Sequence, residues 1–351
     1  MTRNYEIPAT LRIALTAALF CAVVAVYSGC SRDDTVTLLV RHNAPPEQPQ
    51  HRALLHVAEL LESRTDGRIT VEAIASLPVP GQMEDIRAGS REIGMTGAQG
   101  VADFFPPFAV FEAPYVFRDL DHFYATIRSP IGQRILRESE EASNIHVLDV
   151  WHQGVRQVTL RDTPAQTPAE FGNVKLRIPG AVMFVEAAKV LGALPTTMAF
   201  ENVNLGLRSA IIDGQENPLP TIKAMGFQEH CRYLVLTNHI IGTILPVING
   251  DYWRELSPDD QEIITQAFRE GGEYNRRIIE EEEARLVEEF ASQGMIVLRP
   301  DLTVFRERAE RTWLGFRELW GDSLVAEIQA VSSSSTGVDT ETQSTLSALD
   351  G

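Results

Sequence analysis

The order of elements near the amino terminus is the strongest constraint on the fold. Two β-rich runs, Val36–Val40 and Ile69–Ile74, enclose a segment, His51–Arg64, in which apolar residues recur at helical spacing. A short helical segment near Met83–Ala88 and a third β-rich run at Ile93–Thr96 follow. Because a β-α-β-α-β order needs crossover connections, it predicts a parallel, doubly wound sheet whose loops gather at one edge.

Three later segments are unusually long. The β-rich runs Val147–Leu160 and Tyr233–Asn249 exceed an ordinary strand, and the second is interrupted near His239 and Gly242. The helical pattern of Ser257–Gly294 extends well beyond the mean helix length of about 11–12 residues. Elements of this length can pass between the lobes of a hinged protein. We therefore expect a two-lobed α/β fold, each lobe a sheet flanked by helices.

The lobes are expected to be discontinuous in sequence. The first would comprise residues 36–153 and 243–281, and the second residues 154–242 and 282–330. Gly271-Gly272 interrupts the long helical pattern at a cost of about 1 kcal/mol per glycine, so we expect a kink there, with simple tolerance as the alternative. Single helices are expected at Asp121–Glu138 and Thr303–Trp320, and the Ser/Thr-rich residues 332–351 are expected to be disordered.

The first 29 residues are typical of a signal peptide. Basic residues flank an apolar run, Ile13–Val26, that is short for a membrane span. The run leads to Ser28-Gly29-Cys30, which resembles a bacterial lipoprotein cleavage box, although Tyr27 replaces the usual leucine. We expect export to the periplasm and a lipid on Cys30 that anchors the chain to a membrane. Plain signal cleavage nearby is the alternative.

Charge and cysteine content exclude several classes of protein. The formal net charge of −17 repels nucleic acid and anionic membranes, so an anionic ligand would have to be bound by local arginines. Three cysteines provide no disulfide framework, and neither CxxC nor HExxH spacing occurs, so no metal and no cofactor are expected. The chain has no GxSxG elbow and no acid/base pair beside a nucleophile, so we do not expect an enzyme.

Arg177 stands inside the apolar segment Lys175–Ile178, directly before Pro179-Gly180. A guanidinium stays charged and offers five donors in a planar fork, so its burial without a partner is costly. Pro-Gly ends the strand and places Arg177 at its carboxyl end, where open α/β sheets form clefts. On this segment alone, an internal pair between Arg177 and a carboxylate is the simpler interpretation.

Two other segments favour a ligand instead. Gly154–Gln157 contains Arg156, and Asp213–Pro218 contains Asn217. Two arginines and a carboxamide near strand ends would form a carboxylate clamp, because arginine supplies a bidentate fork and asparagine adds a neutral donor.

Together these segments resemble the solute-binding subunits of tripartite ATP-independent periplasmic (TRAP) transporters, of the dicarboxylate-binding-protein type. The resemblance extends over Val36–Ile328. Its motifs are DGQENP at 213–218, KLRIPG at 175–180, PTTMAF at 195–200, TNH at 237–239 and AVFEAPYVF at 109–117. It implies capture of a small organic acid and delivery to TRAP membrane permease subunits. Presentation of the same acid to a sensory receptor is the alternative.

The resemblance also implies roles for residues of the second lobe. Arg177 would form the main salt bridge to the ligand carboxylate, Asn217 would hydrogen-bond it, and Arg156 would contact or close on it. Phe200 would pack on the carbon skeleton of the ligand. Gly180 differs from the amide-bearing residue of the sialic-acid branch, so the resemblance does not favour sialate.

The first lobe would contribute Asn43 and the segments around Glu84 and Gln99 to the same ligand. His239 is either a further ligand contact or a core or hinge residue.

Overall fold

The computed structural model describes residues 35–42, 44–75 and 80–333. Its strands are β1 (Val36–His42), β2 (Ile69–Ala75), β3 (Ile93–Thr96), β4 (Ile145–Val147), β5 (Trp151–Leu160), β6 (Lys175–Ile178), β7 (Leu194–Thr197), β8 (Gly214–Pro218), β9 (Tyr233–Val235), β10 (Ile241–Asn249) and β11 (Ile296–Leu298). Its α-helices are α2 (Pro49–Arg64), α3 (Gln82–Arg87), α4 (Ala98–Ala102), α5 (Leu120–Arg128), α6 (Pro130–Ser143), α7 (Val182–Leu191), α8 (Val203–Arg208), α9 (Leu219–Met225), α10 (Gly250–Glu255), α11 (Pro258–Ser292), α12 (Thr303–Trp313), α13 (Arg317–Trp320) and α14 (Leu324–Gln329). Short 3₁₀ turns occur at η1 (Pro106–Glu112), η2 (Glu170–Asn173), η3 (Phe200–Asn202), η4 (Phe227–His230) and η5 (Leu314–Phe316).

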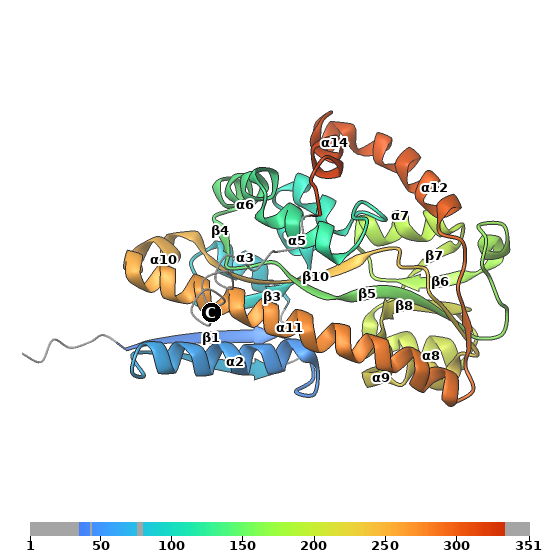
Figure 1. Cartoon of the computed structure of the whole chain (residues 1–351), viewed down its shortest axis with the longest axis horizontal. Coiled ribbons are helices and arrows are strands. Elements are labelled where there is room, and N and C mark those ends of the chain that lie inside the picture. Colours follow the sequence, from blue (N-terminus) through green and yellow to red (C-terminus); the bar gives the residue numbers. More distant parts are fainter. Residues whose placement is uncertain (1–34, 43, 76–79, 334–351) are drawn as a thin grey trace, which may run out of the picture.

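The sheet contains two parallel groups of strands. It runs in the order β2-β1-β3-β10-β5-β8-β6-β7, with β4 beside β10 and β9 between β5 and β11 (Figure 1). β1 is parallel to β2 and β3, whereas β6 is parallel to β7 and β8. The parallel arrangement predicted for the amino-terminal strands is therefore confirmed. Helices flank both groups, which gives the expected two-lobed α/β fold.

Two antiparallel strands join the lobes. β10 pairs with β5 through Ile241–Ile244 and with β3 through Leu245–Val247. β5 continues into the second lobe, where Arg156–Leu160 pairs with β8. Gly154 of β5 lies opposite Gly242 of β10, at the positions where the sequence places its lobe boundaries. Those boundaries remain a proposal. Each predicted long run is in fact divided, by residues 148–150 and 236–240.

The long helix α11 is uninterrupted over 35 residues, and its glycines serve close packing. It runs along α2 of the first lobe, contacts β5 and reaches α9 of the second lobe (Figure 1). The buried Trp151 lies against both glycines, and its indole Nε1 donates to the carbonyl oxygen of Phe268 at 3.0 Å. Glycine is needed here because a Cβ atom would clash with Val57 at the first position and with Asp149 and the indole at the second. The two glycines thus have a packing role, and the kink expected from sequence stays a prediction.

Gly272→Ala is expected to lower the free energy of unfolding by about 1–3 kcal/mol, although alanine is the better helix former. A Cβ atom at Gly272 would lie 2.6 Å from Oδ2 of Asp149 and 2.7 Å from Nε1 of Trp151. Urea denaturation measures the change. The control is Gly315→Ala, where no atom lies within 4 Å of the new methyl group. Equal stability of Gly272→Ala and the parent chain would refute the packing explanation.

Two helices expected to be single are divided in the structure. The first ends at Arg128, and a new one begins at Pro130 with Ser129 as its cap. Proline has no backbone N–H to donate within a helix, so a break replaces the predicted Asp121–Glu138 helix. The predicted Thr303–Trp320 helix is likewise a series, α12, η5 and α13, with Gly315 at the 3₁₀ turn between the α-helices.

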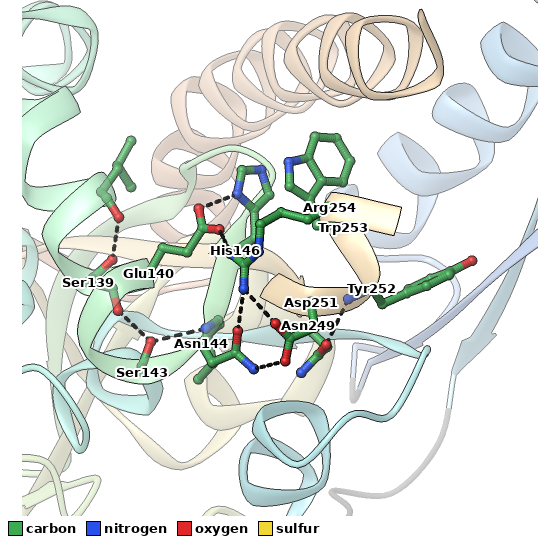
Figure 2. Close-up of polar contacts among 12 residues, drawn as sticks. Ser139, Glu140, Ser143, Asn144, His146, Asn249, Asp251, Tyr252, Trp253 and Arg254 are labelled. Carbon is green, nitrogen blue, oxygen red and sulfur yellow. Dashed lines mark hydrogen bonds and ion pairs between the residues drawn. The ribbon is translucent and has the colours of Figure 1, made fainter. Parts of the chain in front are cut away.

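A polar network fastens α6 to α10 at the end of the first lobe (Figure 2). Arg254 donates to Glu140 at 2.8 Å, to Asn144 at 2.9 Å and to Asp251 at 2.7 Å. Nδ1 of His146 lies 2.7 Å from the same Glu140 carboxylate. Burial alone would raise the pKa of Glu140, but the contacts with His146 and Arg254 lower it. These charges therefore balance one another within the protein.

The half-buried Glu283 of α11 makes stability depend on pH. Its Oε1 accepts a hydrogen bond from the backbone N–H of Val155 at 2.8 Å, beside Gly154. Burial raises the pKa of Glu283 to about 8, and the neighbouring Glu280 adds to the rise. The folded chain therefore holds a proton that the unfolded chain releases above about pH 4.5. Folding stability contributed by this group is present below that pH and is lost as the pH rises toward 8.

Glu283→Gln keeps an acceptor for Val155 and cannot ionise. We expect the variant to be more stable than the parent at pH 8.5, by about 1 kcal/mol or more, and similar to it at pH 4.5. Urea denaturation at both pH values measures the difference, with the exposed Glu288→Gln as the control. An unchanged pH slope in Glu283→Gln would contradict the assignment.

Candidate functional site

Side chains of both lobes line a cleft of about 390 Å³. The first lobe contributes residues that follow β1 and β3, together with part of η1. The second lobe contributes residues at the carboxyl ends of β6 and β8, and β5 and β10 supply the floor between them. This is the position where parallel α/β sheets form ligand sites, because the connecting loops diverge there.

Arg177 is buried at the edge of this cleft, with 3% of its surface exposed. Its Nε and Nη2 both donate to the carbonyl oxygen of Met198, at 2.9 and 2.7 Å. No carboxylate of the described residues lies within 4.0 Å of its guanidinium. Burial lowers the pKa of Arg177 to about 10, although the more distant charge of Glu216 opposes the fall. Arg177 thus retains a buried charge without an acidic partner.

Arg156, in contrast, is neutralised by the protein. Its Nε donates to Oε2 of Glu216, and its Nη2 donates to Oε1 of Glu216 at 2.9 Å. Nε2 of His239 lies 3.2 Å from the same carboxylate, and all three side chains are buried. Burial alone would raise the pKa of Glu216, but the charge of Arg156 and the contact with His239 lower it. The internal pair considered for Arg177 from sequence therefore belongs to Arg156.

His239 does not line the cleft. Its Nδ1 lies 2.8 Å from the hydroxyl of Thr237, and burial lowers its pKa despite the nearby Glu216. The core interpretation of His239 thus accounts for its contacts.

Asn217 and Phe200 both line the cleft as expected from sequence. Oδ1 of Asn217 accepts from Nη2 of Arg156 at 3.0 Å, and its Nδ2 donates to Gln215 at 2.6 Å. The Phe200 ring is 38% exposed, and its centroid lies 5.7 Å from the Arg177 guanidinium. The cleft therefore combines a cation, a carboxamide and an apolar ring on its second-lobe side.

Of the three first-lobe residues predicted from sequence to contact the ligand, the structure places one in the cleft. Gln99 lines the cleft. Glu84 is exposed on α3 and does not line it, because α3 presents Ile86 rather than Glu84 to the interior. Asn43 lies outside the described residues, as does Cys30 with the whole predicted signal segment.

Sequence reasoning missed several first-lobe residues of the cleft. They are Gln48, Gln50, Glu112 and Thr243. Glu112 accepts hydrogen bonds at its Oε1 from the backbone N–H and the hydroxyl of Thr243, at 3.1 and 2.8 Å. Burial raises the pKa of Glu112, although both bonds from Thr243 oppose the rise. The available signal was a lone carboxylate in the otherwise apolar segment AVFEAPYVF.

Residues 35–42, 44–75 and 80–333 contain no group of three His, Cys, Asp or Glu side chains arranged to hold a metal ion. No helix in the same ranges is both long and apolar enough to cross a membrane.

A cleft between two sheet-based lobes joined by crossing strands defines a solute-binding protein of the periplasmic type. Comparison with known proteins supports this class. The chain is 30% identical to the sialic acid-binding periplasmic protein SiaP of Vibrio cholerae, over 88% of this chain and 97% of the relative. It is 29% identical to the 2,3-diketo-L-gulonate-binding periplasmic protein YiaO of Escherichia coli, over 81% of this chain and 87% of the relative.

A solved structure shares the fold. The TRAP periplasmic solute-binding protein of Roseobacter denitrificans, with bound 3-deoxy-D-manno-oct-2-ulosonic acid, superposes with a TM-score of 0.78 at 30% identity, covering 85% of this chain and all of the other. Residues 40–319 match the model of bacterial extracellular solute-binding protein family 7. The chain belongs to this family, whose members bind organic acids for TRAP transporters.

Proposed function

We propose that this chain captures a small organic acid in the cleft, with the ligand carboxylate on Arg177, and delivers it to TRAP membrane permease subunits. The observation that carries the proposal is the buried charge of Arg177, which forms no ion pair with an acidic side chain of the described residues. A ligand carboxylate would supply the missing bidentate partner. The acids named for the relatives above all carry a carboxylate and are consistent with this role.

We further propose that the chain transports its ligand without chemical change. The histidine that lines the cleft, His42, has its Nε2 2.9 Å from Nδ1 of His51, and burial with the neighbouring His51 lowers its pKa to about 4. Among the described residues, no hydrogen bond joins His42 to a hydroxyl of the cleft. An activated nucleophile would need such a bond to a base.

A thermal-shift screen of organic acids tests the binding proposal. A ligand present at 100 times its dissociation constant should add about 2.7 kcal/mol to the free energy of unfolding. Neutral polyols serve as controls for effects of the solvent. Stabilisation by polyols alone, with no response to any acid, would overturn the proposal.

We also propose a lipid anchor at Cys30, because an apolar run and two small residues directly precede this cysteine. Mass spectrometry of the mature protein isolated from membranes is expected to show a diacylated Cys30 at the amino terminus. Cys30→Ser should release the protein from the membrane fraction. An unmodified terminus at another residue would refute the anchor and leave the binding proposal intact.

A further inference from the structure

The charges around the cleft restrict the ligand beyond its being an acid. Among the described residues that line the cleft, Arg156 is paired with Glu216, and His42 is neutral at pH 7. Arg177 is the remaining cation, and it lacks an acidic partner. A carboxylate taken out of water needs a counter-charge or several donors. The cleft therefore provides one strong carboxylate site, and a second carboxylate would lack an unpaired cation.

The first-lobe wall offers acceptors in place of cations. Oε1 of the buried Gln50 has no hydrogen-bond partner among the residues that the structure describes. Glu112 brings a carboxylate to the same wall, and only 5% of its surface is exposed. A ligand hydroxyl can donate a proton to such acceptors, whereas an ionised ligand carboxylate can only accept. A buried acceptor without a hydrogen bond is costly. A ligand hydroxyl that donates to Gln50 therefore increases the affinity of the ligand.

We propose that the cleft selects acids that carry one carboxylate and a hydroxyl-bearing chain, with the carboxylate on Arg177 and hydroxyls directed to Gln50 and Glu112. The inference rests on the proposed function and narrows its ligand class. Sugar acids of the aldonate type meet both requirements. A dicarboxylate would bring its second negative charge to the buried wall around Glu112, where no unpaired cation among the described lining residues offsets the loss of its hydration.

Calorimetry with matched ligands tests the selectivity on the unmodified protein. Each pair differs only in the oxidation of the terminal CH₂OH group to a carboxylate: D-erythronate with meso-tartrate, L-gulonate with glucarate, and D-galactonate with galactarate. Succinate represents a dicarboxylate without hydroxyls, and galactitol a polyol without a carboxylate. In the pair with the tightest aldonate, we expect the aldonate to bind at least about 30-fold more tightly than its diacid. We expect no measurable binding of galactitol.

Two variants locate the selectivity in the first-lobe wall. Glu112→Gln keeps an acceptor for Thr243 and adds an amide donor that a ligand carboxylate can accept from, so the preference for the aldonate over its diacid should fall at least about tenfold. Gln50→Met keeps the side-chain length and removes the acceptor, so aldonate affinity should fall about tenfold while succinate affinity stays unchanged. Glu288→Gln, on the exposed side of α11, is the control.

The outcomes separate this inference from the proposed function. Diacids or succinate binding as tightly as the aldonates would overturn the selectivity and leave acid capture standing. Galactitol binding as tightly as galactonate would overturn carboxylate capture by Arg177, and the selectivity with it. A panel in which no acid binds to the folded protein would likewise overturn both.

Discussion

Arg177→Ala is expected to weaken binding of the acid ligand by about 2–5 kcal/mol, a loss of about 30-fold to more than a thousandfold. The ligand carboxylate would lose its unpaired cationic partner while remaining desolvated in the cleft. Arg177→Lys should not restore binding, because an ammonium group cannot reproduce the planar fork of a guanidinium. Calorimetry with a ligand from the thermal-shift screen measures both losses.

The matched control is Arg208→Ala, since Arg208 is exposed at the end of α8 and does not line the cleft. The affinity of the Arg208→Ala variant for the acid ligand should equal that of the parent protein. Circular dichroism verifies that each variant is folded before titration. Affinities within threefold of the parent in both Arg177 variants would eliminate Arg177 as the carboxylate site.

Glu216→Ala is expected to lower the free energy of unfolding by about 3–5 kcal/mol, because it leaves Arg156 buried without its partner. The carboxylate accepts from Arg156 and contacts His239, and all three side chains are buried. The effect should also depend on pH. Because the pKa of Glu216 is lowered in the folded chain, its stabilising contribution is present above about pH 4.5 and is lost as the pH falls through the folded value.

Urea denaturation of Glu216→Ala, Glu216→Leu, Arg156→Met and the Arg156→Met/Glu216→Leu double variant tests this pairing. Replacement of both partners by apolar residues should restore much of the stability lost in Glu216→Ala, since no unpaired charge remains. Additive losses in the double variant would show that the two side chains do not act as a pair.

Local patterns in the sequence predicted the elements that position the site. The parallel strands of the first lobe follow from apolar periodicity, and the end of β6 follows from Pro179-Gly180. Arg177 at that strand end was therefore predictable from one short segment. Asn217 came from a motif rather than from spacing, and it too lines the cleft.

The pairing of the arginines could not be read from sequence. β5 and β8 are antiparallel, with Arg156 opposite Pro218 and Gln157 opposite Asn217. That register brings the Arg156 guanidinium to Glu216, and no spacing along the chain encodes it. The first-lobe residues Gln50 and Glu112 were missed for the same reason, since their proximity to Arg177 arises only when the lobes come together.

The place of β10 in the sheet has a consequence for how the chain folds. β10 is tenth in chain order, yet it lies between β3 and β5 in the sheet. Its Leu245 pairs with Thr96 of β3, which is far away in the sequence. Until ribosomal synthesis has passed Asn249, the inner edge of β3 has no neighbour. Contacts so distant in sequence slow folding, and an open strand edge invites association with other chains. The sheet of the first lobe is therefore completed only by a strand that follows much of the second lobe in the chain.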